Sequence, residues 1–146
     1  TKDGMFIGLV WGIFTMIRAF TSPTTPLDIA VFTNPIISVV PRVLVGLVAG
    51  LLFTIIYKKT KKVVAASIVA AIFGTITNTV LVLTLMGTLY TGLVATTYGV
   101  DASALFVTLG GIAVTNGISE VITAAILTPI LVKALFAATS LRPENR

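Results

Sequence analysis

Four long apolar runs, separated by short polar segments, dominate the pattern of hydrophobic and polar positions along the chain. They cover residues 4–20, 35–57, 63–90 and 104–135. A membrane-spanning helix needs roughly 20 apolar residues, so the first run is marginal and the last two are long enough to tilt or to project from the bilayer. The pattern predicts an all-α fold: a polytopic bundle of membrane helices that forms a single transmembrane domain over residues 1–146.

The composition of the 146-residue chain supports a membrane environment. Hydrophobic residues make up 56% and charged residues 10%, and the mean hydropathy is +1.08. A soluble domain carries about 25% charged residues, because its whole surface must be hydrated. The lipid bilayer is therefore predicted to be the main solvent of this protein.

The basic residues gather near the ends of the apolar runs. Four lysines lie within residues 58–62, Lys2 precedes the first run, and Lys133 and two arginines lie at the end of the last run. Positively charged loops favour the cytoplasmic side of a membrane. We therefore expect the Lys58–Lys62 loop and the C-terminus to be cytoplasmic, and only Arg18 and Arg42 fall elsewhere. The net charge of +5 forms no basic face of the kind that binds nucleic acid.

The chain contains no cysteine and no histidine. This excludes disulfides, Cys/His zinc sites, haem held by histidine and His-based catalytic triads. The sequence also offers no plausible nucleophile–base pair, no metal cluster and no nucleotide-binding loop. We expect a protein that is not an enzyme and has no cofactor, so that any active transport would draw its energy from a partner.

Small residues recur at spacing four in three of the runs, which places them on one helix face. Such faces let helix backbones approach closely in lipid. The pattern predicts helix packing at the positions Gly4, Gly8 and Gly12, at Gly46 and Gly50, and at Ala66, Ala70 and Gly74.

The connections at residues 21–34 and 91–103 fall on the outer side in this topology. The first contains two prolines and is too long for a tight helical turn. It is either a lid over the bundle or a plain connector.

Arg42 is the ionisable residue that membrane orientation does not explain. A charge within a span costs about 2.5–3.5 kcal/mol on insertion scales, so it marks a candidate site. Pro41 precedes it and is expected to bend the helix. In one interpretation Arg42 pairs with Glu120 or extends to the interface. In the other it faces an outward-open cavity, where its planar guanidinium binds a carboxylate or phosphate.

Other polar side chains lie near the middle of the spans. Asn78, among several threonines, can join helices or bind a hydroxyl or amide of a ligand. Asn116 and Glu120 are four residues apart and share a helix face, and Glu120 is protonated, paired with Arg42, or structural. Trp11 either packs between helices or forms a ligand wall with an indole N–H donor.

Several segments resemble a known family of membrane proteins. The similar segments are NPIISVVPRVLVGLVAG (34–50), GTITNTVLVL (74–83), NGISEVI (116–122) and AILTP (125–129), preceded by KDG (2–4) and GLVWG (8–12). They resemble the substrate-binding S component of energy-coupling factor (ECF) vitamin transporters, and within that family most resemble the pantothenate-specific component.

The resemblance implies a six-helix fold of which these four spans are the last four, so we expect the sequence to lack two preceding helices. It also implies a pocket that uses Trp11, Arg42 and Asn78. Arg42 would bind the pantothenate carboxylate and Asn78 its amide or a hydroxyl, while Trp11 would cover its dimethyl group or donate a hydrogen bond through the indole N–H. Asn116 completes the predicted set of substrate-binding residues, because it is another amide within a span.

The resemblance further implies partners and a mechanism. They are a transmembrane T component and two cytoplasmic ATPases, with a vitamin bound in an outward-facing pocket and delivered across the bacterial cell membrane by reorientation of the subunit. Three alternatives stay open: an S component for another vitamin or precursor (folate or a thiamin precursor), a proton-coupled carrier that uses Glu120, and a structural subunit without a ligand.

Overall fold

The computed structural model describes residues 1–24 and 26–138. Within that part of the chain the regular structure is helical, and its elements are α1 (Lys2–Thr21), α2 (Pro26–Phe32), α3 (Pro35–Ser38), α4 (Val40–Thr60), α5 (Val63–Leu89), α6 (Thr91–Tyr98) and α7 (Leu105–Ala138). Four segments are long and apolar enough to cross a membrane: Lys2–Thr21, Pro35–Thr60, Val63–Leu89 and Leu105–Ala138. The predicted all-α bundle with four spans is confirmed.

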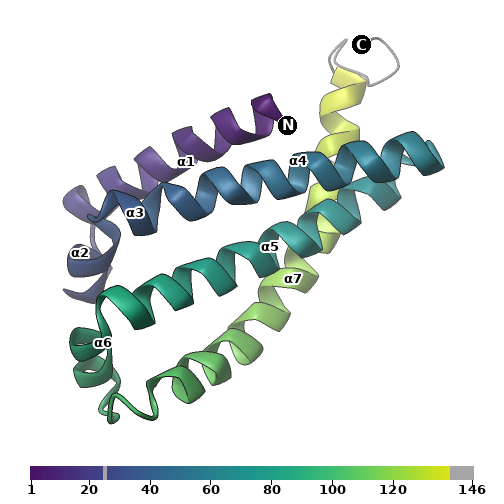
Figure 1. Cartoon of the computed structure of the whole chain (residues 1–146). Helices are drawn as coiled ribbons and strands as arrows, with labels where there is room; N and C mark the ends of the chain where they lie inside the picture. The colour runs from purple at the N-terminus through teal and green to yellow at the C-terminus, as the bar shows by residue number, and fades with distance from the viewer. Residues whose placement is uncertain (25, 139–146) are drawn as a thin grey trace.

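The long helices pack in the order α1, α4, α5 and α7 (Figure 1). Helices α1, α4 and α5 run side by side, and α7 packs on α5 and crosses it at an angle. The short helices α2, α3 and α6 gather at one end of the bundle, whereas the turn between α4 and α5 lies at the other. The basic cluster at residues 58–62 and the polar connections therefore occupy opposite ends.

Helices α1 and α4 approach each other through glycines. A methyl group added at Gly4 would collide with the carbonyl oxygen of Gly46, and one added at Gly8 would collide with the carbonyl oxygen of Arg42. Apolar side chains gain little by leaving lipid for a neighbouring helix, so close backbone contact is the main source of attraction between such helices. The predicted packing role of the glycine repeat is confirmed for this pair of helices.

The second span is interrupted near the end of the bundle that carries the short helices. Asn34 caps α3 by accepting a hydrogen bond from the N–H of Ile36 at 2.9 Å, and α3 ends at Ser38. Helix α4 then begins at Val40. The break lies just before Pro41, because proline is tolerated in the first turn of a helix, where its missing N–H has no partner to lose. Arg42 consequently lies in the first turn of α4.

The two connections at residues 21–34 and 91–103 contain short helices. Their residues Val31 (in α2), Val94 and Ala95 (both in α6) are buried with Ile37, Val82, Met86, Leu105 and Leu109 in one apolar cluster. Pro26 begins α2, and the Asp28 carboxylate accepts the N–H of Thr24 at 2.9 Å just before that helix. The connections are therefore packed parts of the bundle, while their role as a lid stays a prediction.

The α1–α4 contact predicts a position-specific effect of adding one methyl group. We expect Gly46→Ala to lower the free energy of unfolding by about 1–3 kcal/mol, because overpacking forces the two backbones apart. Gly110→Ala is the matched control, since a Cβ at Gly110 meets no atom within 4 Å, and it should be neutral or slightly stabilising. Unfolding in detergent micelles measures both variants, and equal effects would contradict the close packing.

Candidate functional site

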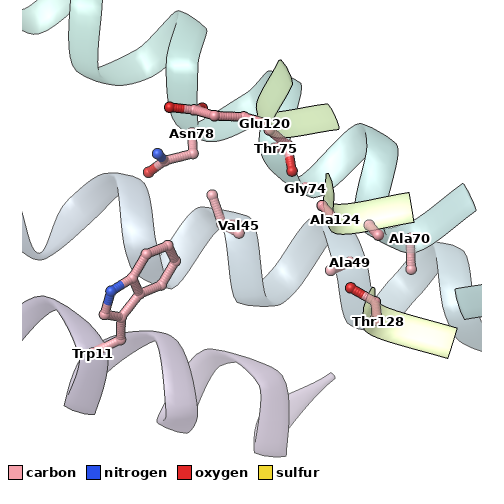
Figure 2. A pocket seen from close by; sticks show the side chains of 11 residues that line it. Trp11, Val45, Ala49, Ala70, Gly74, Thr75, Asn78, Glu120, Ala124 and Thr128 are labelled. Carbon is pink, nitrogen blue, oxygen red and sulfur yellow. The ribbon is translucent and has the colours of Figure 1, made fainter. Parts of the chain in front are cut away.

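A cavity of about 480 Å³ lies among α1, α4, α5 and α7 (Figure 2). Most of its wall is made by alanine, glycine and valine, whose small side chains leave the space between the helices open. Its polar groups come from three helices and are Trp11, Thr75, Asn78, Glu120 and Thr128. In Figure 2 the indole of Trp11 projects from α1 toward Asn78 and Glu120.

A second cavity of about 290 Å³ adjoins the first. Asn78 and Glu120 line both cavities, and the second is closed by residues of α2, α6 and α7, among them Asp28, Tyr98 and Asn116. The two spaces therefore meet at the Asn78 and Glu120 side chains. Together they extend from the middle of the bundle toward the end that carries the short helices.

Asn78 holds an unsatisfied acceptor at the junction of the cavities. Its Oδ1 atom is buried and has no hydrogen-bond partner among the described residues. Leaving a buried polar atom unpaired costs about 1–3 kcal/mol, and such atoms are rare in folded proteins. A ligand that donates an N–H or O–H to this oxygen would remove that cost.

Arg42 is buried between two aromatic rings. Its side chain is 7% exposed, and Cζ lies 5.5 Å from the ring centroids of both Trp11 and Phe32. Nη1 donates to the carbonyl oxygen of Ile37 at 2.9 Å. Nε is buried and finds no acceptor in the described part of the chain. Arg42 thus ties α4 to α1, α2 and α3, and one of its donors stays available.

The alternative in which Arg42 pairs with Glu120 is not observed, because no ion pair joins these two described residues. Glu120 instead accepts a hydrogen bond from Thr79 at 3.4 Å. The burial of Arg42 also shows that it does not extend to the interface. Its guanidinium lies next to the rings of Trp11, which lines the larger cavity, and Phe32, which lines the smaller one. Among the described residues that line these two cavities, Arg42 itself is absent.

The structure places the predicted site residues in one region of the bundle, but neither cavity is lined by all of them. Trp11 and Asn78 share the larger cavity, and Asn78 and Asn116 share the smaller one. Trp11 is 47% exposed, which leaves a large part of the indole accessible. Asn116 is also exposed and lies one turn before Glu120 on α7.

Sequence reasoning missed the contribution of α2. Phe32 stacks on Arg42, and Asp28 lines the smaller cavity. Asp28 also lies 3.8 Å from Arg18, whose Nη1 donates to Thr24 at 3.0 Å. Asp28 is the acidic residue of the connection at residues 21–34, and this charge could have marked it as a candidate site residue. Phe32 offered no such signal, because its contact depends on how α2 folds back over the helix ends.

The fold and the cavities define a multi-pass membrane protein with ligand-sized, mainly apolar cavities in its helix bundle, into which a few polar groups project. Comparison with known families agrees with this class: the sequence profile described as ECF transporter, substrate-specific component, matches residues 1–132. The chain belongs to this family. The family resemblance seen in the sequence is therefore confirmed.

Two relatives carry a named function. The chain is 36% identical over 149 aligned residues to the pantothenic acid transporter PanT of Lactococcus lactis subsp. cremoris (strain MG1363), a match that covers 94% of this chain and 70% of that protein. It is 38% identical over 52 residues to the pantothenate transporter PanT of Leuconostoc mesenteroides subsp. mesenteroides, covering 36% of this chain and 25% of that protein.

The stacking of Arg42 predicts a structural role that is measurable without a ligand. We expect Arg42→Ala to lower the free energy of unfolding by about 2–3 kcal/mol, because it removes two cation–π contacts and a hydrogen bond from a charged donor. Arg18→Ala serves as the control, since the half-exposed Arg18 should contribute about 1 kcal/mol or less. Thermal unfolding in detergent distinguishes the two variants. A smaller loss for Arg42→Ala than for Arg18→Ala would show that the stack is not stabilising.

Proposed function

We propose that this chain is the non-catalytic, vitamin-binding subunit of an ATP-driven ECF importer and that its ligand is pantothenate. The observation that carries the proposal is the unpartnered, buried Oδ1 of Asn78 at the junction of two cavities. Membership of the substrate-specific component family and the two PanT relatives support a vitamin as the occupant.

The chemistry of pantothenate suits the polar groups of the cavities. The molecule carries an amide, two hydroxyls, a dimethyl group and one carboxylate. Asn78 can accept a hydrogen bond from the amide N–H or a hydroxyl, and the exposed indole of Trp11 can cover the dimethyl group. Asn116 can bond a hydroxyl that reaches the smaller cavity.

The carboxylate is assigned to Arg42. Its Nε is a buried donor without a described acceptor, and an arginine–carboxylate hydrogen bond is stronger than a neutral one. The carboxyl group of Glu120 lines both cavities and that of Asp28 lines the smaller one, and ionised carboxyl groups disfavour a bound anion. Because the rings of Trp11 and Phe32 cover Arg42, binding by this route requires one of the rings to move aside.

The energy for transport is assigned to partner subunits, namely a T component and two cytoplasmic ATPases, because the sequence contains no nucleotide-binding motif. Positively charged loops favour the cytoplasm, so the Lys58–Lys62 turn and Lys133 mark the inner end of the subunit. The cavities then extend toward the outer end, where α2 and α6 lie. This is the orientation that an importer needs to capture a vitamin from outside.

Pantothenate binding should be visible through Trp11, the single tryptophan of the chain. We expect pantothenate to change the tryptophan emission of the wild-type protein, and Asn78→Ala to weaken binding by about tenfold, which corresponds to about 1.4 kcal/mol for a lost hydrogen bond. Thr77→Val is the matched control: Thr77 is on the same helix, but its hydroxyl bonds the carbonyl of Phe73 at 2.7 Å. Calorimetric titration checks the affinities independently.

The same titration with panthenol, in which an alcohol replaces the carboxylate, tests the role of Arg42. Wild-type protein should prefer pantothenate, and Arg42→Gln should bind the two compounds alike. Equal binding by the wild-type protein would refute the carboxylate assignment. If the protein bound folate or a thiamin precursor and not pantothenate, the vitamin assignment would be wrong.

The source of energy is tested by uptake in cells. We expect labelled pantothenate uptake to require the T component and both ATPases. We expect Glu120→Gln to retain uptake, because an importer driven by ATP does not need proton transfer by a carboxyl group that lines its cavities. Thr79→Val removes the hydroxyl that donates to Glu120 and is measured alongside Glu120→Gln as a second change at the same carboxyl group. Uptake that survived loss of the ATPases and disappeared with Glu120→Gln would favour the proton-coupled carrier instead.

A further inference from the structure

A third cavity, of about 440 Å³, lies at the opposite end of the bundle from α2 and α6. It is formed between the first turns of α5 and the last part of α7, and its lining residues are Lys62, Val63, Val64, Ala65, Ile68 and Lys133. The surface that faces the cavity is apolar, so the two lysines contribute the methylene parts of their side chains. Lysine commonly covers apolar surface with its stem while its ammonium group stays in a polar environment.

The two lysines have no ion pair within the described part of the chain. Their neighbours in the basic cluster are placed differently. Lys61 lies over the ring of Tyr57, with Nζ 5.8 Å from the centroid, and Lys58 and Lys59 occupy the last turn of α4. The dipole of a helix stabilises a cation at the C-terminus. The charges of Lys58 and Lys59 are therefore stabilised by α4, whereas the charge of Lys62, at the start of α5, gains no such stabilisation.

Lys62 lies at the start of α5, and its side chain makes no capping hydrogen bond. The first N–H groups of a helix have no partner within the helix, and the positive end of the helix dipole favours an anion over a cation. Val63 and Val64, the next two residues of α5, contribute side chains to the apolar wall of the cavity. An anionic group near Lys62 and Lys133 would therefore be favoured at the mouth of an apolar cavity.

We infer that this cavity binds an anionic phospholipid, with an acyl chain against Val63, Val64 and Ile68 and its phosphate between Lys62 and Lys133. The apolar wall favours a lipid over free phosphate, since a soluble anion would leave that wall exposed. The position agrees, because Lys62 immediately precedes one candidate span and Lys133 lies near the end of another. Basic pockets between membrane helices are suited to anionic headgroups. The inference does not depend on which vitamin the other cavities bind.

The full chain in mild detergent, supplied with phosphatidylglycerol or phosphatidylcholine, tests this site by native mass spectrometry. We expect the wild-type protein to retain phosphatidylglycerol, and Lys62→Gln/Lys133→Gln to weaken retention by about tenfold or more. The control Lys58→Gln/Lys59→Gln removes the same charge outside the cavity and should retain the lipid. Lys62→Arg/Lys133→Arg should also retain it, while Ile68→Trp, which fills the cavity and keeps both lysines, should lose it.

Four results would overturn the inference. Equal loss in the two glutamine double variants would indicate diffuse surface charge, and equal retention of phosphatidylcholine would show no preference for an anion. Displacement of the lipid by millimolar inorganic phosphate would indicate a simple anion site. Loss of copurifying partner subunits with unchanged lipid retention would assign the surface to a protein. Unchanged melting temperatures of the variants show that each result reflects binding and not unfolding.

Discussion

Close contact between the backbones of α1 and α4 is the constraint on which the rest of the structure depends. Gly8 leaves room for the carbonyl group of Arg42, and Gly4 and Gly46 approach each other one or more turns along the same interface. In lipid there is little hydrophobic gain from burying apolar side chains, so packing of this kind must hold the helices together. The contact also sets the register that places Trp11 over the guanidinium of Arg42.

The same use of small residues creates the cavity. On α5, Gly74 lies against α4, where Ala49 and Val45 are its nearest neighbours, and Ala70, one turn earlier, is buried. These side chains allow the helices to approach, but they are too short to fill the space that opens where α7 crosses at an angle. In the proposed complex, a ligand in that space would replace contacts that larger side chains would otherwise make. Helix packing and the candidate binding cavity therefore draw on one set of residues.

The sequence predicted the parts of this molecule that depend on local pattern. Hydropathy located the four spans, and the spacing of small residues identified faces that pack, because both properties repeat along a single helix. Which of these faces meet, as those of α1 and α4 do, came from the structure. The folding of the two connections into α2 and α6 was not predicted, since their burial depends on a cluster drawn from several distant segments. The family resemblance named Trp11 and Asn78, which line cavities, but it did not predict that two cavities meet at Asn78.

Arg42 shows most clearly what could not be predicted from the sequence. Its position within a span marked it as unusual, but a sequence does not show which groups surround a buried cation. The structure surrounds it with the Ile37 carbonyl and the rings of Trp11 and Phe32, which are contributed by three different helices. The ring of Phe32 could not be foreseen because α2 itself was unforeseen.

The partners of Arg42 have a consequence for binding. Aromatic faces attract a cation less strongly than a carboxylate does, and they cannot accept the hydrogen bonds that the guanidinium offers. The unpartnered Nε of Arg42 and Oδ1 of Asn78 are thus a donor and an acceptor within the same bundle. In the proposed complex, the ligand's carboxylate would partner the donor once a covering ring moves aside, and an N–H or O–H of the ligand would partner the acceptor.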